Sequence, residues 1–343
     1  MQAEPMFPGA PRASGMYESF YLRAVSPREP VGIWIRHTVH KRPGRAPTGS
    51  VWCTVFDAAA EGPFTHKTTS ELLRAPAGSW IEVGAGATMG PQSAHGECGP
   101  ARWSLRIAGI APELRHLRPS LLYRAPVPRT KLTSPAPLAR FDGVVEVPGR
   151  GALDVTAWPG MVGHNWGAEH AARWIWLHGC DFEGAPQAWL DVALGRVRVG
   201  SRLTPWLANG MLSVGGAAHR LGGIGAPRPR VAERAGGAEL ELFGRRGLRV
   251  SAHAEVPPGS AAGWRYVDPG NGDDVDPDDG EGEASPDAGG HDVVNCSIAR
   301  LSLELSHRGA GGRRLLHSDH GGAYELGMTE RDHGVPLAPF ADG

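Results

Sequence analysis

The residues of this chain that could do chemistry are concentrated between positions 161 and 196. This stretch reads MVGHNWGAEHAARWIWLHGCDFEGAPQAWLDVALGR and holds four of the eleven tryptophans, three of the fifteen histidines and four acidic residues. Ionisable groups among indole rings suit proton transfer to a carbon–carbon double bond, because burial keeps a carboxylic acid protonated and aromatic faces stabilise developing positive charge. We therefore expect any active site of the protein to lie here.

Three residues of this stretch are candidate proton donors: Asp191, Glu169 and His164. Asp191 has the apolar neighbours Leu190 and Val192, which predict a buried carboxyl group; a structural aspartate is the alternative. Glu169 comes where the chain is expected to turn, so a solvated surface position is an equal alternative. For His164 the alternative is a hydrogen-bonded structural histidine, since imidazoles serve both purposes.

Alternation along strands predicts which side chains would line a pocket. Residues two apart in a strand share a face, so Trp174, Trp176 and His178 point one way, and Trp189 shares a face with Asp191 on the next strand. Tryptophans at alternate strand positions also pack protein cores, because indoles bury a large apolar area. The predicted substrate-binding residues are Trp166, Trp174, Trp176, His178 and Trp189.

Other kinds of site are not indicated. His164 and His170 are six residues apart, which matches neither the i, i+2 spacing of a strand nor the i, i+4 spacing of a helix, so no metal site is expected. The glycines at 222–225 are followed by Pro-Arg-Pro-Arg, which cannot open a helix, so the dinucleotide fingerprint fails and no cofactor is expected. The four cysteines form no C-x-x-C pair and are expected to be buried free thiols.

Short alternating apolar runs must supply the elements that position these residues. Residues 31–41 and 50–57 read as a hairpin, and further runs follow at intervals of roughly 10 to 15 residues with turn residues between them. A strand is also expected at 121–124, and only 70–74 and 169–172 offer short helix candidates. The pattern predicts an all-β protein built as a sandwich or barrel.

The motif His-Asn-Trp-Gly at 164–167, followed by Trp-x-Trp at 174–176, resembles the AttH-like superfamily, whose best-known enzymes are the carotenoid 1,2-hydratases (hydroxyneurosporene synthases). Residues 129–138 show a second, looser resemblance to the same superfamily. The resemblance implies two lipocalin-like antiparallel β-barrel or sandwich domains packed together, with the motif at their junction, where pockets tend to occur. It also implies a hydro-lyase, or a related cyclase or isomerase, that works without a cofactor.

On this basis the chain divides into a flexible tail at 1–16, an N-terminal lipocalin-like domain at 17–170 and a C-terminal one at 171–343. A disordered acidic loop is expected inside the second domain at about 268–290, because this segment holds nine acidic and no basic residues and can bury almost nothing. A calcium loop is not favoured there, since the spacing of ligands is wrong.

One position departs from the family pattern. The hydratases have an aspartate directly before His-Asn-Trp-Gly, whereas this chain has Gly163, which cannot transfer a proton. Either another acid does the work, or the protein is not a hydratase. The alternatives are a non-catalytic carrier with the same pocket and a structural tandem barrel whose interior is filled by side chains.

The composition of the chain limits the classes of partner that we expect. Lysine and arginine number 35 against 36 acidic residues, without a basic stripe, so no nucleic-acid partner is expected. No run of about 18 apolar residues occurs, so no integral membrane segment is expected. The start lacks the unbroken apolar core of a signal peptide, which favours a cytoplasmic location. The expected partner is a hydrophobic or amphipathic small molecule of isoprenoid or polyene type.

Overall fold

The computed structural model describes residues 3–270, 290–308 and 312–342; for residues 341 and 342 it describes the backbone only. Of the predicted acidic loop at 268–290, only 268–270 and 290 fall within these ranges. The described elements are strands apart from three short 3₁₀ helices, which confirms the all-β class: η1 (Phe7–Gly9), η2 (Ser120–Tyr123) and η3 (Arg245–Gly247). No described helix is long and apolar enough to cross a membrane.

The first sheet has twelve strands in the order β4-β3-β2-β1-β12-β11-β9-β8-β7-β6-β5, with β10 paired to β11. It curls into a nearly closed barrel, in which the Cys98 thiol donates to the carbonyl oxygens of Val51 at 3.1 Å and His66 at 3.3 Å across the seam. Its strands are β1 (Met16–Val25), β2 (Val31–Lys41), β3 (Thr48–Asp57), β4 (Phe64–Ser70), β5 (Leu73–Arg74), β6 (Ile81–Val83), β7 (Ala87–Met89), β8 (Ser93–Cys98), β9 (Ala101–Gly109), β10 (Leu114–Arg115), β11 (Thr130–Val147) and β12 (Gly151–Gly167).

The second sheet has eleven strands in the order β18-β17-β14-β13-β24-β23-β21-β20-β19, with β22 paired to both β23 and β25. A bridge joins Leu221 of the edge strand β18 to Gly244, which directly follows β20, so the sheet curls back toward itself. A separate hairpin joins β15 to β16. The strands are β13 (Arg173–Gly179), β14 (Trp189–Arg196), β15 (Arg198–Val199), β16 (Arg202–Leu203), β17 (Leu207–Val214), β18 (Ala217–Gly222), β19 (Arg230–Arg234), β20 (Gly237–Phe243), β21 (Leu248–Glu255), β22 (Ala262–Val267), β23 (Gly290–His307), β24 (Arg313–Met328) and β25 (Leu337–Asp342).

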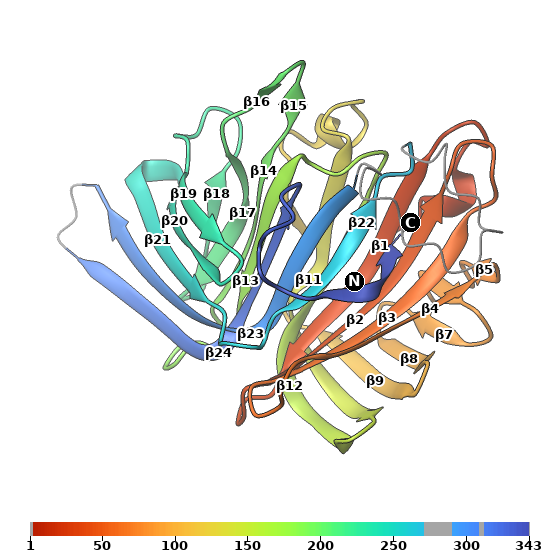
Figure 1. Ribbon diagram of the computed structural model, residues 1–343. Coiled ribbons are helices and arrows are strands. Elements are labelled where there is room, and N and C mark those ends of the chain that lie inside the picture. Colours follow the sequence, from red (N-terminus) through yellow and green to blue (C-terminus); the bar gives the residue numbers. More distant parts are fainter. Residues whose placement is uncertain (1–2, 271–289, 309–311, 343) are drawn as a thin grey trace.

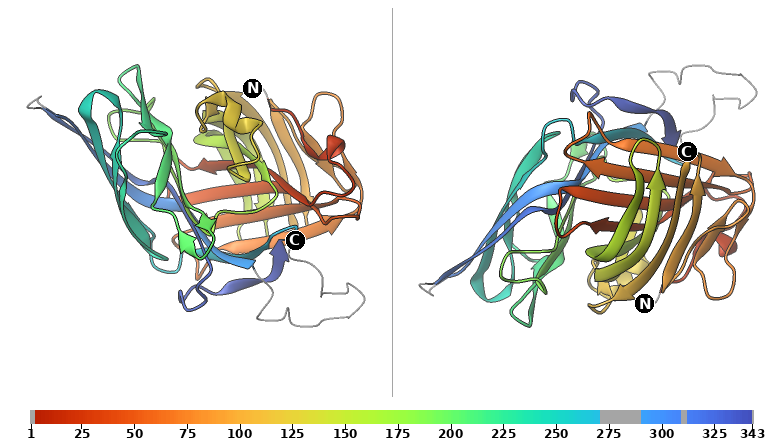
Figure 2. Two further views of the ribbon diagram at one scale, coloured as in Figure 1. Left: turned by 90° about the horizontal axis from the view of Figure 1, so that it is seen from above. Right: turned by 90° about the horizontal axis from the view of Figure 1, so that it is seen from below.

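The two curled sheets lie side by side, and the second reaches onto the outer face of the first (Figures 1 and 2). Trp34 on β2 stacks on Trp264 of β22 with ring centroids 4.9 Å apart, and Trp52 on β3 meets Phe340 of β25 at 5.4 Å. Outward-facing residues of the first sheet thus belong to the same apolar core as the second sheet. Burial of these aromatic rings is the main force that joins the two sheets.

Residues 3–15, which the sequence places in a flexible tail, contact the first barrel. Phe7 is buried, and the backbone N–H groups of Met6 and Phe7 donate to the carboxylate of Glu18 on β1. The burial of Glu18 explains this contact, because a carboxylate inside a barrel needs donors around it.

Two local expectations are wrong. Residues 121–124 do not form a strand, because this proline-flanked segment buries no side chain in a sheet and begins instead as η2 after Pro119. Neither helix candidate is helical: 70–74 holds the end of β4 and all of β5, and 169–172 is the irregular connection between the two sheets.

Candidate functional site

A cavity of about 840 Å³ lies between the outer face of the first sheet and the second sheet. This is the size of pockets that hold small-molecule ligands. Strands β1, β2, β11 and β12 form one wall, and β13, β14, β17 and β22 form the other, together with Glu325 of β24. The segments at 117–129, 169–172, 197–200 and 222–229 also line the cavity. The lining residues used below are Tyr17, Tyr21, Trp34, Arg36, Glu169, His170, Trp174, Trp176, Tyr266 and Glu325.

Alternation along β1 supplies one wall of the cavity. Tyr17 and Tyr21 face outward into it, whereas Phe20 and Leu22 face inward and are fully buried in the first barrel. The same alternation on β13 brings Trp174 and Trp176 to the opposite wall. The two sheets therefore present aromatic rings to one another across the cavity.

Both tryptophans of β13 are held by hydrogen bonds from their indole nitrogens. Trp174 Nε1 donates to Glu325 Oε1 at 2.9 Å, and Trp176 Nε1 donates to Asp191 Oδ1 at 3.1 Å. The Tyr21 ring meets Trp176 edge-on at 5.6 Å. Because their polar atoms are satisfied by the protein, the rings can offer apolar surface to a ligand.

The structure places the other predicted substrate-binding residues away from the described cavity lining. Trp166 stacks on His164 at 4.6 Å on the inner side of β12. Trp189 is only 4% exposed and packs in the core of the second sheet. His178 is fully buried between the sheets. Strand alternation predicts which residues share a face, but it does not say which part of the protein each face contacts.

Asp191, the first candidate proton donor, is fully buried and lies outside the described cavity lining. It accepts hydrogen bonds from Ser134 Oγ and Trp176 Nε1, and His116 Nε2 lies 3.5 Å from its Oδ2. Burial alone would raise the pKa of Asp191, but the charge and hydrogen bond of His116 and the Ser134 hydroxyl outweigh it, so the pKa is lowered. An ionised carboxylate is the opposite of the acid that a hydration step needs.

His178, the strand neighbour of Asp191, has a buried set of polar partners of its own. Arg23 on β1 donates from Nη1 to His178 Nδ1 at 2.9 Å, and His178 Nε2 lies 2.9 Å from the carbonyl oxygen of Pro137. Arg23 Nη2 also donates to two carbonyl oxygens of the second sheet, those of Ser297 and Gly322. Burial and the neighbouring guanidinium lower the pKa of His178 to about 4. The network therefore links the two sheets and holds a neutral imidazole.

The remaining two candidate donors lie in opposite surroundings. His164 is buried inside the first barrel, where its Nε2 lies 2.7 Å from Glu18 Oε1 and its ring stacks on Phe20 at 4.1 Å. Glu169 lines the cavity at its rim, is 46% exposed and forms an ion pair with Arg129. Of the three predicted donors, Glu169 is the one that can reach a ligand in the cavity.

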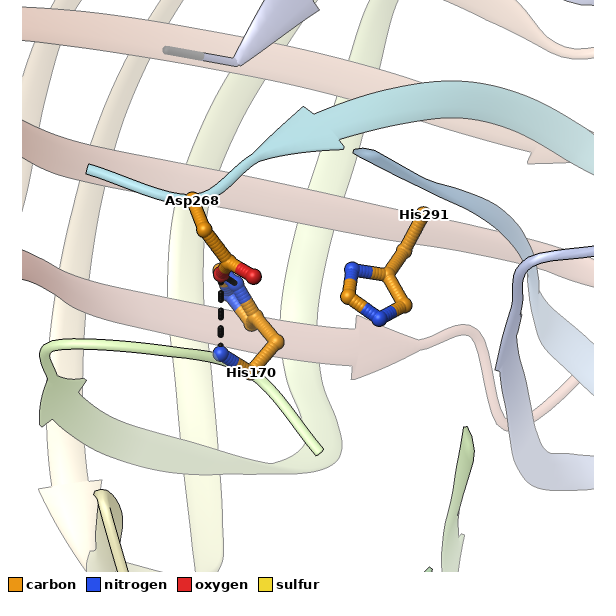
Figure 3. Close-up of side chains that lie close together, drawn as sticks. All are labelled: His170, Asp268 and His291. Atoms are coloured by element: carbon orange, nitrogen blue, oxygen red, sulfur yellow. Dashed lines mark hydrogen bonds and ion pairs between the residues drawn. The ribbon is translucent and has the colours of Figure 1, made fainter. Parts of the chain in front are cut away.

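A second cluster at the cavity was not found from the sequence. His170 Nδ1 lies 2.7 Å from Asp268 Oδ1, and the backbone N–H of His170 donates to the same oxygen at 2.8 Å. His291 lies beside them, with a ring nitrogen facing the carboxylate (Figure 3). One ligand atom from each of the three residues lies within 4.8 Å of the others.

The electrostatics of this cluster favour a charged Asp268 carboxylate beside a neutral His291 imidazole. Burial would raise the pKa of Asp268, but the hydrogen bonds and charge of His170 lower it overall. Burial and then His170 lower the pKa of His291 to about 4. Local spacing could not reveal the cluster, because His170 comes from the connection between the sheets, whereas Asp268 follows β22 and His291 begins β23.

No protein-family model matches the chain. Two uncharacterized proteins of Mycobacterium tuberculosis, MT0513 of strain CDC 1551 and Rv0493c of strain H37Rv, are each 29% identical to it over 168 residues, which is 48% of this chain and 50% of theirs. The chain therefore spans about half the length of the curated relatives it matches.

Three solved structures share the arrangement over nearly the whole chain. The AttH-type protein NE1406 of Nitrosomonas europaea covers 95% of this chain and 96% of its own, with a TM-score of 0.52 and 12% identity. Kievitone hydratase from Nectria haematococca covers 95% and 91%, with a TM-score of 0.52 and 9% identity. CghA covers 92% and 88%, with a TM-score of 0.58 and 10% identity. This chain has the AttH-like fold.

Within this AttH-like fold, the structure explains the glycine that stands before His-Asn-Trp-Gly. Gly163 on β12 is paired with Tyr21 on β1, and a Cβ at position 163 would lie 2.1 Å from Cζ and 2.4 Å from Oη of Tyr21. The phenol ring thus takes the space of a side chain at 163. Burial, together with the charges of Asp191 and Glu325, raises the pKa of Tyr21 above its usual range, so its hydroxyl stays protonated.

We expect Gly163→Ala to lower the free energy of unfolding by about 1–3 kcal/mol, the usual cost of overpacking a core. The Tyr21 ring cannot move away easily, because Trp176 and Trp34 pack against it. Urea denaturation measures the loss. Gly312→Ala is the control, since a Cβ there meets no atom of the described residues within 4 Å. The loss should disappear when Gly163→Ala is made in a Tyr21→Ala background; an equal loss in both backgrounds would contradict the steric explanation.

Proposed function

We propose that the protein binds an elongated, mostly apolar small molecule of isoprenoid or polyene type in the cavity at the sheet junction. The observation that carries this proposal is the cavity of about 840 Å³ with aromatic rings on both walls. A purely structural tandem barrel is less well supported, because close-packed proteins rarely leave a space of this size.

Polar groups on one wall of the cavity suggest that the ligand also carries oxygen. Arg36 is only 4% exposed, its Nε donates to Ser19 Oγ at 2.9 Å, and its guanidinium lies over the Tyr266 ring at 4.4 Å. A buried cation at a cavity wall attracts a carboxylate or carbonyl oxygen. The protonated hydroxyl of Tyr21 adds a neutral donor on the same wall. An amphipathic ligand fits these groups better than a pure hydrocarbon.

We further propose proton-transfer chemistry of the hydratase, cyclase or isomerase kind on this ligand. The support is the pair of His170, which lines the cavity, and Asp268, which orients its ring; a carboxylate-held imidazole is a common general acid or base. Kievitone hydratase is an enzyme by its name and shares the fold, but fold alone does not carry an activity across. Glu169 at the rim is the second candidate for the same step.

A non-catalytic carrier is the alternative, and the hydrogen bonding of the acids at the cavity favours it. Glu325 accepts from Trp174 Nε1 and from Asn295 Nδ2, while Glu169 is paired with Arg129. Mass spectrometry of small molecules that copurify with the protein separates the two: a single bound polyene supports a carrier, and a substrate–product mixture supports an enzyme. A protein that carries no ligand and binds no polyene probe would contradict the binding proposal.

We expect Trp176→Leu to weaken the binding of a fluorescent polyene fatty acid about tenfold, because the loss of an aromatic contact costs roughly 1 kcal/mol or more. Titration of the probe's fluorescence measures the dissociation constant. Trp158→Leu is the matched control, since both tryptophans are 6% exposed but Trp158 lies in the core of the first barrel. Equal weakening by both variants would show that the effect is general loosening of the fold and not loss of a ligand contact.

A further inference from the structure

We propose that His170, Asp268 and His291 form a binding site for a divalent transition-metal ion, Zn²⁺ in the first place, at the wall of the junction cavity. Two imidazoles and one carboxylate are a ligand set that such ions prefer, and Ca²⁺ or Mg²⁺ would require more oxygen ligands. Pairing of β22 with β23 places Asp268 close to His291, and the connection between the two sheets brings His170 to them (Figure 3).

The spacing of the three ligand atoms is close to what one ion needs. They lie within 4.8 Å of one another, whereas ligand atoms around a tetrahedral zinc ion are about 3.3 Å apart, given bonds of about 2.0–2.1 Å. Small side-chain movements close this difference. His170 Nδ1 would exchange its contact with Asp268 for a bond to the ion.

A buried ring nitrogen of His291 gives an independent reason to place a metal ion here. Its side chain is 7% exposed, and its Nδ1 is buried with no hydrogen-bond partner in the described part of the chain. Buried polar atoms without a partner are rare in folded proteins and need an explanation. Figure 3 shows a ring nitrogen of His291 facing the Asp268 carboxylate, so an ion between them would supply the missing partner.

The other two ligands are already held in place. The His170 ring stacks on Tyr17 with centroids 4.0 Å apart and planes within 13°, and its backbone N–H binds the Asp268 carboxylate. Arg265 and Arg331 are both bonded to Asp292, the residue next to His291. Ordered ligands lose little freedom when an ion binds, which favours affinity.

Three protein ligands leave at least one coordination position for water or substrate. Of the three residues, His170 is the one that lines the described cavity, so we place the open coordination position on its side of the ion. Open three-ligand zinc sites polarise oxygen groups or activate water, whereas closed four-ligand sites are structural. This role in catalysis rests on the proposed function and would replace the acid–base role of the His170–Asp268 pair, because both residues would then bind the ion. Metal binding itself does not rest on the proposed function.

Isothermal titration of the chelator-treated full chain with ZnCl₂ tests the site. We expect one ion per chain, and at least a tenfold weakening in His291→Asn and in Asp268→Asn, since the loss of even an outer-shell partner has effects of about 10- to 100-fold. His317→Asn is the matched control, because His317 belongs to an exposed group with Glu183 and Asp319 that also resembles a metal site. It should leave binding unchanged.

Direct ligation has a spectroscopic test. In His291→Cys loaded with Co²⁺, a thiolate-to-cobalt charge-transfer band should appear that the unmodified protein lacks, and its circular dichroism should confirm an unchanged fold. Absence of stoichiometric Zn²⁺ binding, or binding that His317→Asn abolishes and His291→Asn leaves intact, would overturn the proposal. The polyene titration of the metal-free protein is independent of these results, so failure of the metal site and failure of the ligand cavity are distinguishable.

Discussion

Acidification from pH 7 to pH 4 is expected to destabilise the protein strongly, because two fully buried histidines must remain neutral in the folded state. The pKa of His178 is about 4 and that of His37 about 3, against about 6.5 in an unfolded chain. Between these values the unfolded state binds more protons than the folded state, so stability is lost as the pH falls. A shift of this size corresponds to roughly 3 kcal/mol or more for each histidine.

The surroundings of His178 show why it resists protonation. Its Nδ1 accepts a hydrogen bond from the Arg23 guanidinium, so a proton there would place two donors and two positive charges face to face. Burial is the larger cause of the low pKa, and Asp191 opposes it only in part. His37 is fully buried in the first barrel, and burial, with His95 nearby, holds its pKa low.

Chemical denaturation at a series of pH values measures the free energy of unfolding at each pH. The slope of that free energy against pH gives the number of protons taken up on unfolding. His178→Gln should reduce that number by about one between pH 4 and pH 6.5, since a glutamine does not titrate. His253→Gln is the control, because His253 is exposed on β21. Unchanged proton uptake in His178→Gln would show that this histidine is not the group responsible.

Replacement of Asp191 by alanine is expected to lower the free energy of unfolding by about 3–5 kcal/mol, the cost of removing one partner from a buried charged network. Without the carboxylate, the Ser134 hydroxyl and the Trp176 indole lose their acceptor inside the protein. His116, which is 1% exposed, also loses its neighbouring charge. These groups come from both sheets, so the junction itself should loosen.

A double-mutant cycle with Ser134→Ala isolates this network. We expect the two changes to be strongly non-additive, because each removes the same hydrogen bond. Asp154→Ala is the control: Asp154 is exposed on β12, and its loss should stay within about 0.5 kcal/mol. A cost for Asp191→Ala as small as that of the control would mean that the carboxylate does not stabilise the junction, and its assignment as a proton donor would regain support.

The sequence by itself determined the fold class. Alternating apolar runs between turn residues predicted strands, and the His-Asn-Trp-Gly and Trp-x-Trp motifs indicated the AttH-like arrangement that the solved structures share. It also selected Trp174 and Trp176, which do line the cavity. These features can be predicted from the sequence because the two-residue period of a strand and a short motif depend only on residues that are close together in the sequence.

Only the tertiary structure decided what each ionisable group can do. Asp191 resembles a buried acid in the sequence, yet His116 and Ser134 approach it from the other sheet and keep it ionised. In the sequence, glycine at position 163 suggests that the proton-donating aspartate of the hydratases has been lost. In the structure, the ring of Tyr21 occupies the space of that side chain. His170 acquires its partners only when Asp268 and His291 reach the junction. A pKa and a ligand set depend on neighbours in space, and those neighbours are set by long-range strand pairing and sheet packing that no local pattern records.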